Sequence, residues 1–190
     1  MDLLAVASHW IEATQLSFQY HKSLADRAIV QVSDEALHQT LDAETNSIAL
    51  IVQHLSGNLA SRWTDFLTSD GEKPWRNRDQ EFIDANVGRA ELLAAWDAAW
   101  NQLFTTLSAL VPADLERTVT VRGEPHSVPL AIQRSLAHAS YHVGQIVILA
   151  RHWAGEEWTT LTIPRGGSAA YNAQGWGSGD YAKRAERPGN

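Results

Sequence analysis

Residues 3–31 contain neither proline nor glycine, the two residue types that most often interrupt a helix. Apolar side chains recur in this stretch at steps of three and four, which is the spacing of one face of an α-helix. They are Leu3, Val6, Trp10, Ala13, Leu16, Tyr20 and Leu24. The pattern predicts a long amphipathic helix whose apolar face other helices must cover.

Three later segments carry the same periodicity. Residues 47–68, 89–110 and 129–153 each predict a helix, with Ser47 as the cap of the second and Gly155 beyond the end of the fourth. Four helices of such length are typical of a four-helix bundle. The predicted fold class is therefore all-α.

The connections between these helices differ in character. Residues 33–46 form a polar break, and turn chemistry in residues 69–82 predicts an exposed connection. In residues 118–128, β-branched side chains flank a Gly-Glu-Pro sequence at 123–125. This pattern predicts a small β-hairpin between the third and fourth helices, with its turn at that sequence.

The end of the chain changes in composition. Six of the twelve glycines fall after Ile163, in a segment that cannot bury a core of its own. We expect one helical domain over residues 1–165, followed by an extended strap and a flexible tail over residues 166–190.

Charge and composition exclude several classes of partner. The chain of 190 residues has 15 Lys and Arg against 22 Asp and Glu, a formal net charge of −7, so we expect no nucleic acid partner. Its longest apolar runs cover about five residues, far fewer than the roughly 20 of a membrane-spanning helix, so we expect no membrane partner and a cytoplasmic location. Cysteine is absent, so any thiol chemistry needs a thiol from another molecule.

The most informative polar motif is a histidine pair on the predicted fourth helix. Of eight histidines, only His138 and His142 stand four residues apart. Four residues turn a helix by about 400°, so the two rings share one face and are about 6 Å apart along the axis. Two imidazoles on one helix face at this spacing can coordinate one metal ion.

The helix faces around these histidines carry small, polar side chains. Ser135, Tyr141 and Gln145 accompany the pair, and Asn58 lies near His54 on the predicted second helix. If the two helices are neighbours, His54 supplies a third nitrogen and leaves coordination positions open for water or substrate. In the alternative interpretation, His138 and His142 face solvent and His54 is a hydrogen-bonded core residue. The other histidines lack such spacing, and we expect them to be solvated; His126, in the hairpin turn, could rim a pocket.

Several motifs together resemble a known superfamily. They are Gln53-His54-Leu55-x-x-Asn58, His138-x-x-x-His142 and the following Gly144-Gln145, with the longer blocks NSIALIVQHLSGNLASRWTDFLTSDGEKPWRNRDQEF, VTVRGEPHSV, LAHASYHVGQIVILARH and LTIPRGGS. These blocks resemble the DinB/YfiT-like superfamily, in particular a DinB-related branch without a characterised function, over roughly residues 10–170. The resemblance implies a four-helix bundle, often a homodimer, that binds zinc or nickel through His54, His138 and His142.

Characterised members of that superfamily include thiol-dependent isomerases and S-transferases. The resemblance thus implies a metal-dependent transfer of a low-molecular-weight thiol to a small electrophile, with Asn58, Tyr141 and Gln145 orienting the ligands. Two alternatives stay open. One is metal-assisted hydrolysis, for which the sequence identifies no general base, since Asp42, Glu44, Asp65 and Asp84 stand near predicted helix ends. The other is a non-catalytic metal-binding stress or interaction protein.

Overall fold

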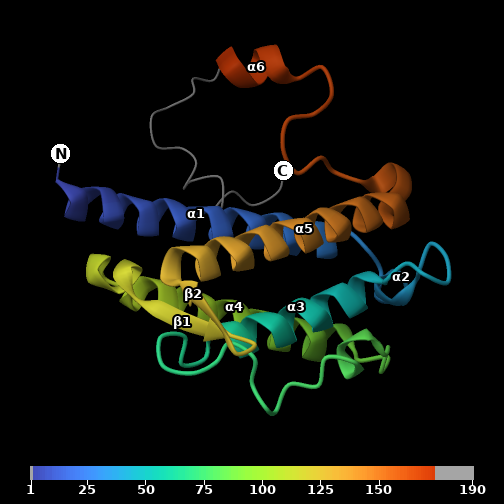
Figure 1. The fold of residues 1–190 in the computed structure, drawn as a ribbon. Coiled ribbons are helices and arrows are strands. Elements are labelled where there is room, and N and C mark those ends of the chain that lie inside the picture. Colours follow the sequence, from blue (N-terminus) through green and yellow to red (C-terminus); the bar gives the residue numbers. More distant parts are fainter. Residues whose placement is uncertain (1, 174–190) are drawn as a thin grey trace.

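The chain is mainly helical and carries one two-stranded antiparallel hairpin in the computed structural model, which describes residues 2–173 (Figure 1). The α-helices are α1 (Leu3–Ile29), α2 (Asp34–His38), α3 (Ile48–Trp63), α4 (Arg89–Ala109), α5 (Val128–Ala154) and α6 (Ser168–Ala173). The strands are β1 (Thr118–Val121) and β2 (Glu124–Ser127), and short 3-10 turns are η1 (Gln80–Phe82), η2 (Pro112–Glu116) and η3 (Gly155–Glu157).

Side-chain caps explain where α3 and α5 begin. The Oγ of Ser47 accepts a hydrogen bond from the backbone N–H of Leu50 at 3.2 Å, so the predicted cap of this helix is confirmed. Ser127 caps α5 in the same way through the N–H of Leu130 at 3.3 Å. Helix α5 ends at Gly155, whose φ of 57° is a conformation that glycine adopts without strain.

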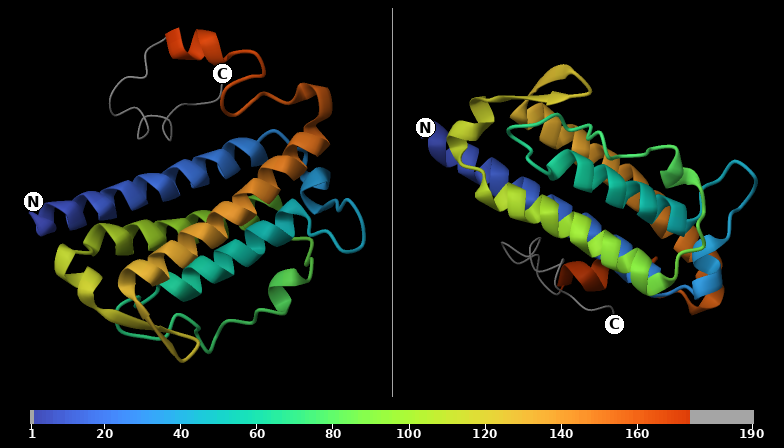
Figure 2. Two further views of the ribbon diagram at one scale, coloured as in Figure 1. Left: turned by 45° about the horizontal axis from the view of Figure 1, so that its top comes forward. Right: turned by 90° about the horizontal axis from the view of Figure 1, so that it is seen from below.

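The four long helices share one hydrophobic core. Helix α1 lies against α5, α3 lies against α4, and α3 also contacts α5 (Figures 1 and 2). At the centre, the ring of Phe18 from α1 meets Trp63 of α3 at 5.8 Å and Trp100 of α4 at 6.2 Å between centroids, both edge to face. This packing holds α3 and α5 side by side, which is the condition for a site between them.

Two boundaries differ from the sequence-based expectation. The predicted polar break contains α2, which Ser33 caps through the N–H of Ala36. Helix α3 ends at Trp63 rather than near residue 68, because the chain turns at Asp65, with a φ of 50°, so that the ring of Phe66 stacks on Trp63 at 4.9 Å.

The predicted hairpin is confirmed, but its turn lies earlier than expected. Arg122 and Gly123 have φ values of 56° and 75°, the left-handed pair that a tight two-residue hairpin turn requires. Pro125 therefore belongs to β2, where it pairs with Thr120. A two-stranded sheet consists of edge strands only, and edge strands tolerate proline.

The connection from α3 to α4 is not simply exposed, so that prediction is wrong in part. The N–H of Gly71 donates to the carbonyl of Thr120 at 2.8 Å, which ties the connection to the hairpin. Lys73 and Glu81 are buried, each with 7% of its surface exposed. The connection thus forms a cover over one side of α3.

The C-terminal region contains a short helix, α6, inside the segment expected to be extended. The tail predicted beyond it, over residues 174–190, lies outside the described residues. Between residues 2 and 173, no helix combines the length and apolar character needed to cross a membrane.

Candidate metal centre

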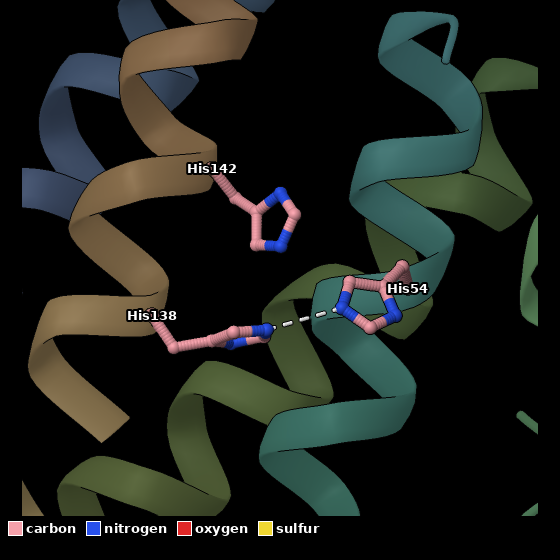
Figure 3. Close-up of side chains that lie close together, drawn as sticks. All are labelled: His54, His138 and His142. Atoms are coloured by element: carbon pink, nitrogen blue, oxygen red, sulfur yellow. Dashed lines mark hydrogen bonds between the residues drawn. The ribbon is translucent and has the colours of Figure 1, made fainter. Parts of the chain in front are cut away.

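Three histidines from two helices converge at the contact between α3 and α5 (Figure 3). His138 and His142 lie one turn apart on α5, and His54 reaches them from α3. One nitrogen of each ring lies within 4.8 Å of the others. His54 and His142 are 4% and 9% exposed, and His138 is half-buried. The tertiary structure thus brings together the three residues predicted as ligands, and the cluster could hold a metal ion.

The orientation of His54 is set by a buried carboxylate. The Nδ1–H of His54 donates to Oε2 of Glu81 at 2.9 Å, because a carboxylate can only accept. Arg76 holds Glu81 from the other side, with Nε to Oε1 at 2.7 Å and Nη2 to Oε2 at 2.8 Å. Burial alone would raise the pKa of Glu81, but the bonds from Arg76 and His54 outweigh it and hold the pKa below its usual value. A carboxylate behind an imidazole is a common arrangement at metal centres.

This approach of Glu81 requires a glycine on α3. A Cβ added to Gly57 would lie 2.3 Å from Oε1 and 2.9 Å from Cδ of Glu81. Both distances are far inside van der Waals contact. Glycine has a low helix propensity, but its lack of a side chain at this position lets the carboxylate reach His54.

A second hydrogen bond orients His142. Its Nδ1–H donates to the amide Oε1 of Gln145 at 2.7 Å. With Nδ1–H engaged in both His54 and His142, the Nε2 atom of each ring carries a lone pair, and that of His54 lies in hydrogen-bond range of His138. These lone pairs are the form in which imidazole binds metals.

His138 completes the cluster. Its Nε2 lies 3.2 Å from Nε2 of His54, and its Nδ1 is buried without a hydrogen-bond partner among the described residues. Burial, with His142 and His54 nearby, lowers the pKa of His138 to about 4. Burial also lowers the pKa of His142, although its bond with Gln145 opposes this. Both rings are therefore neutral at physiological pH, as metal ligation requires.

The donor set fits a divalent ion. Bonds of about 2.1 Å in tetrahedral geometry place ligand nitrogens about 3.4 Å apart. The Nε2 atoms of His54 and His138 already have nearly this spacing, at 3.2 Å, and a ring nitrogen of His142 lies within 4.8 Å of ligand nitrogens in both. Three imidazoles accept zinc, nickel, cobalt or copper, so the donors do not select one metal.

The three residues expected to orient ligands occupy different positions. Asn58 is 5% exposed and lines a cavity beside the cluster. Gln145 contacts His142, as described above. Tyr141 is 64% exposed, with its ring edge to face against His142 at 5.0 Å, and it does not line that cavity. A role for its hydroxyl in orienting a ligand stays a prediction.

The remaining histidines serve local structure or face solvent. The expectation that His126 is solvated is wrong: it lies on β2, is 7% exposed, and its Nε2 contacts Nη1 of Arg134. His38 is not free either, because its Nδ1 lies 2.8 Å from Oδ2 of Asp84. His9 and His152 are exposed, as expected.

Glu81 and Arg76 are functional residues that no sequence pattern predicted. Both lie in a connection without periodicity, and only the fold brings Glu81 to His54, 27 positions away. One signal was present in the sequence. A glycine inside a helical pattern, here Gly57, often marks the close approach of another group.

A cavity of about 170 Å³ adjoins the cluster at His138. Its walls come from α3, α5 and β1, and the connection after α3 closes it with Gly71 and Arg78. None of the residues that line it carries a carboxylate, whereas four are arginines. The cluster therefore lies at one end of a partly enclosed basic space.

Comparison with known proteins gives a family but no activity. A family model described as a protein of unknown function (DUF1572) matches residues 5–167. Neither the curated proteins nor the solved structures include a significant match to this chain.

Proposed function

Because the chain belongs to a family defined only as proteins of unknown function (DUF1572), we propose its function from the histidine cluster: a divalent-metal centre that promotes transfer of a low-molecular-weight thiol to a small electrophile. The observation that carries the proposal is the convergence of His54, His138 and His142 beside a cavity. The four long helices around one core agree with a DinB/YfiT-like four-helix bundle, the fold implied by the sequence resemblance. Zinc and nickel are the metals we expect.

The chain's own residues prepare the centre for this chemistry. Glu81 and Gln145 hold two imidazoles in the tautomer that ligation needs. A bound divalent ion supplies Lewis acidity, which lowers the pKa of a thiol and favours the thiolate. In the transfer, a sulfur–carbon bond forms, the leaving group departs with its electron pair, and the thiol proton passes to solvent.

A hydrolytic function is less well supported, for a specific reason. Attack by water is strongly assisted by a general base within hydrogen-bond reach, because water ionises far less readily than a thiol. Glu81 is the carboxylate that contacts the cluster, and Arg76 and His54 already engage both of its oxygens. Thiol transfer has no such requirement once the thiol is ionised.

Metal analysis by mass spectrometry tests the proposal. Tag-free protein should contain nearly one zinc or nickel per chain, and His54→Ala and His138→Ala should lose it. His152→Ala is the matched control, because this exposed histidine lies on the same helix as His138 and should leave the metal content unchanged. Wild-type protein that refuses added zinc and nickel would overturn the metal centre.

A second measurement separates catalysis from a structural role. Zinc-loaded protein should accelerate the reaction of glutathione, mycothiol or bacillithiol with a chlorodinitrobenzene electrophile, and chelation should abolish the acceleration with the helical spectrum largely kept. If chelation instead unfolds the protein and no thiol reacts, the ion is structural and the protein is a non-catalytic metal-binding protein. We also propose a homodimer, which light scattering would test against the chain mass of 21.0 kDa.

A further inference from the structure

The cavity beside the cluster is strongly basic although the whole chain is acidic. The chain has a net charge of −7, yet Arg62, Arg78, Arg122 and Arg134 all reach this one space. An enclosed region of one sign concentrates ligands of the opposite sign.

The positive charges in the cavity are only partly compensated. Oε2 of Glu72 lies 3.2 Å from Nε of Arg122, 3.8 Å from Nη2 of Arg62 and 4.0 Å from Nη1 of Arg78. It also lies 3.9 Å from Nη1 of Arg76, so one carboxylate is shared by four guanidinium groups, three of them in the cavity. Arg134 makes no ion pair with any residue in the described part of the chain. Among residues 2–173, its one neighbour in hydrogen-bond range is His126, which brings no negative charge.

Asp70 supplies little of the missing charge to the cavity, because the charge of Arg62 lowers its pKa less than its backbone hydrogen bonds do. Its carboxylate accepts hydrogen bonds from the backbone N–H groups of Glu72, Arg122 and Gly123, at 2.7 to 2.8 Å. It therefore binds the connection to the turn of the hairpin.

Arg62 is the most enclosed of these cations. Its side chain is 16% exposed, and its Nη1 is buried without a hydrogen-bond partner among residues 2–173. Burial lowers the pKa of Arg62; the charge of Glu72 opposes this, and the charges of Arg76, Arg122 and Arg134 add to it. A Cβ on Gly71 would lie 3.0 Å from this Nη1, so the backbone of the connection closes against the guanidinium. A cation with so few partners is stabilised by an added anion.

Two ladders of side chains connect the arginines to the histidines. On α3, His54, Asn58 and Arg62 follow one another at four-residue steps, each about 6 Å along the helix axis. On α5, the equivalent steps run from His142 through His138 to Arg134. His54 approaches His138, and Arg62 and Arg134 line the same cavity, so both ladders run from the histidines toward the arginines.

We infer that this cavity binds the negatively charged group of a small substrate, a carboxylate or a phosphate, between Arg62 and Arg134, with the rest of the molecule directed toward His138. Guanidinium groups bind both anions through paired hydrogen bonds. The cavity of about 170 Å³ is smaller than the 300–1,000 Å³ of sites for drug-sized ligands, so the substrate is small. Arg134 lies one helical turn, about 6 Å, from His138 along α5, and Arg62 lies two turns, about 12 Å, from His54 along α3, so the charged group is held one to two turns from the histidines. The inference deepens the proposed function by naming the substrate class.

Binding of simple probes tests this without any assay of activity. The probes are succinate, inorganic phosphate and succinamide, the neutral diamide of succinate. Titrations of metal-free and zinc-loaded protein at low ionic strength can be followed by the NMR signal of the indole N–H of Trp63, which lines the cavity. The metal-free arm isolates the arginines, because an anion can also bind an ion directly.

We expect succinate, phosphate or both to bind metal-free protein at least about tenfold more tightly than succinamide, and to weaken as salt is added. Arg62→Gln and Arg134→Gln should each weaken binding about tenfold. Arg134 is exposed, so its variant tests the site even if Arg62→Gln does not fold. Arg151→Gln is the matched control, an exposed arginine of α5 about 25 Å along the helix from Arg134.

The outcomes separate the two proposals. Anion binding by a protein that takes up no metal would leave this inference standing and overturn the metal-dependent function. Equal affinity for succinate and succinamide, no binding of either anion, or equal losses in Arg134→Gln and Arg151→Gln would overturn the anion site.

Discussion

Replacing Gly57 by alanine should destabilise the protein, although alanine is the better helix former. The new Cβ would lie 2.3 Å from Oε1 of Glu81, so the carboxylate must withdraw by about 1 Å to reach ordinary contact. Its hydrogen bonds to Arg76, now 2.7 and 2.8 Å, and to His54, now 2.9 Å, would then stretch beyond hydrogen-bond range.

The size of the effect follows from these contacts. A hydrogen bond to a charged group contributes about 1.5–3 kcal/mol, and partial loss of the bonds to Glu81 should cost about 3 kcal/mol in all. Alanine in place of a glycine inside a helix stabilises that helix by about 1 kcal/mol. The free energy of unfolding should therefore fall by about 2 kcal/mol.

Gly144→Ala provides the matched control. Gly144 also lies inside a helix, α5, and a Cβ there meets nothing within 4 Å. This variant should gain up to about 1 kcal/mol, so the two glycine variants should differ by about 3 kcal/mol.

Urea denaturation of metal-free protein measures this difference. Competition with a chelating dye measures zinc affinity, which should fall about tenfold in Gly57→Ala because His54 loses the carboxylate behind it, and should not change in Gly144→Ala. Equal stability and wild-type zinc affinity in both variants would refute the argument that Glu81 positions His54. If Gly57→Ala loses stability but Glu81→Gln loses neither stability nor zinc affinity, the steric clash accounts for the lost stability, and the carboxylate contributes to neither property.

Three further predictions concern the core, a loop and the metal centre. Phe18→Ala removes a fully buried ring at the centre of the core and should lower the free energy of unfolding by about 4 kcal/mol in urea denaturation; a loss below about 1 kcal/mol would contradict the packing. Backbone hydrogen bonds, the strongest from the N–H of Glu72, lower the pKa of Asp70, so its stabilising effect is present above the unfolded-state pKa of about 3.9 and is lost as the pH falls through the lower folded pKa. Asp70→Asn should thus be less stable than wild type at neutral pH, with a gap that closes in strong acid; a gap independent of pH would argue against this. Gln145→Leu leaves the Nδ1–H of His142 without its acceptor and should weaken zinc binding about tenfold in dye competition, whereas unchanged affinity would show that Gln145 does not orient the ring.

The sequence by itself determined the local features of this protein. Apolar periodicity identified the four long helices, and Ser47 and Gly155 marked two of their ends. Each of these signals acts over a few residues, where helix geometry and hydrogen bonds to the nearest turn decide the outcome. The pairing of His138 with His142 belongs to the same class, because a four-residue step on a helix fixes two rings on one face.

Only the tertiary structure decided what surrounds that pair. His54 is 84 positions from His138, and Glu81 lies in a connection whose sequence has turn chemistry but no period. The burial of Glu81 depends on Arg76 and on the space above Gly57, and the basic cavity depends on a hairpin and a connection that meet over α3 and α5. Such contacts join segments that are distant in the chain, so they follow from how the whole core packs and not from any local propensity.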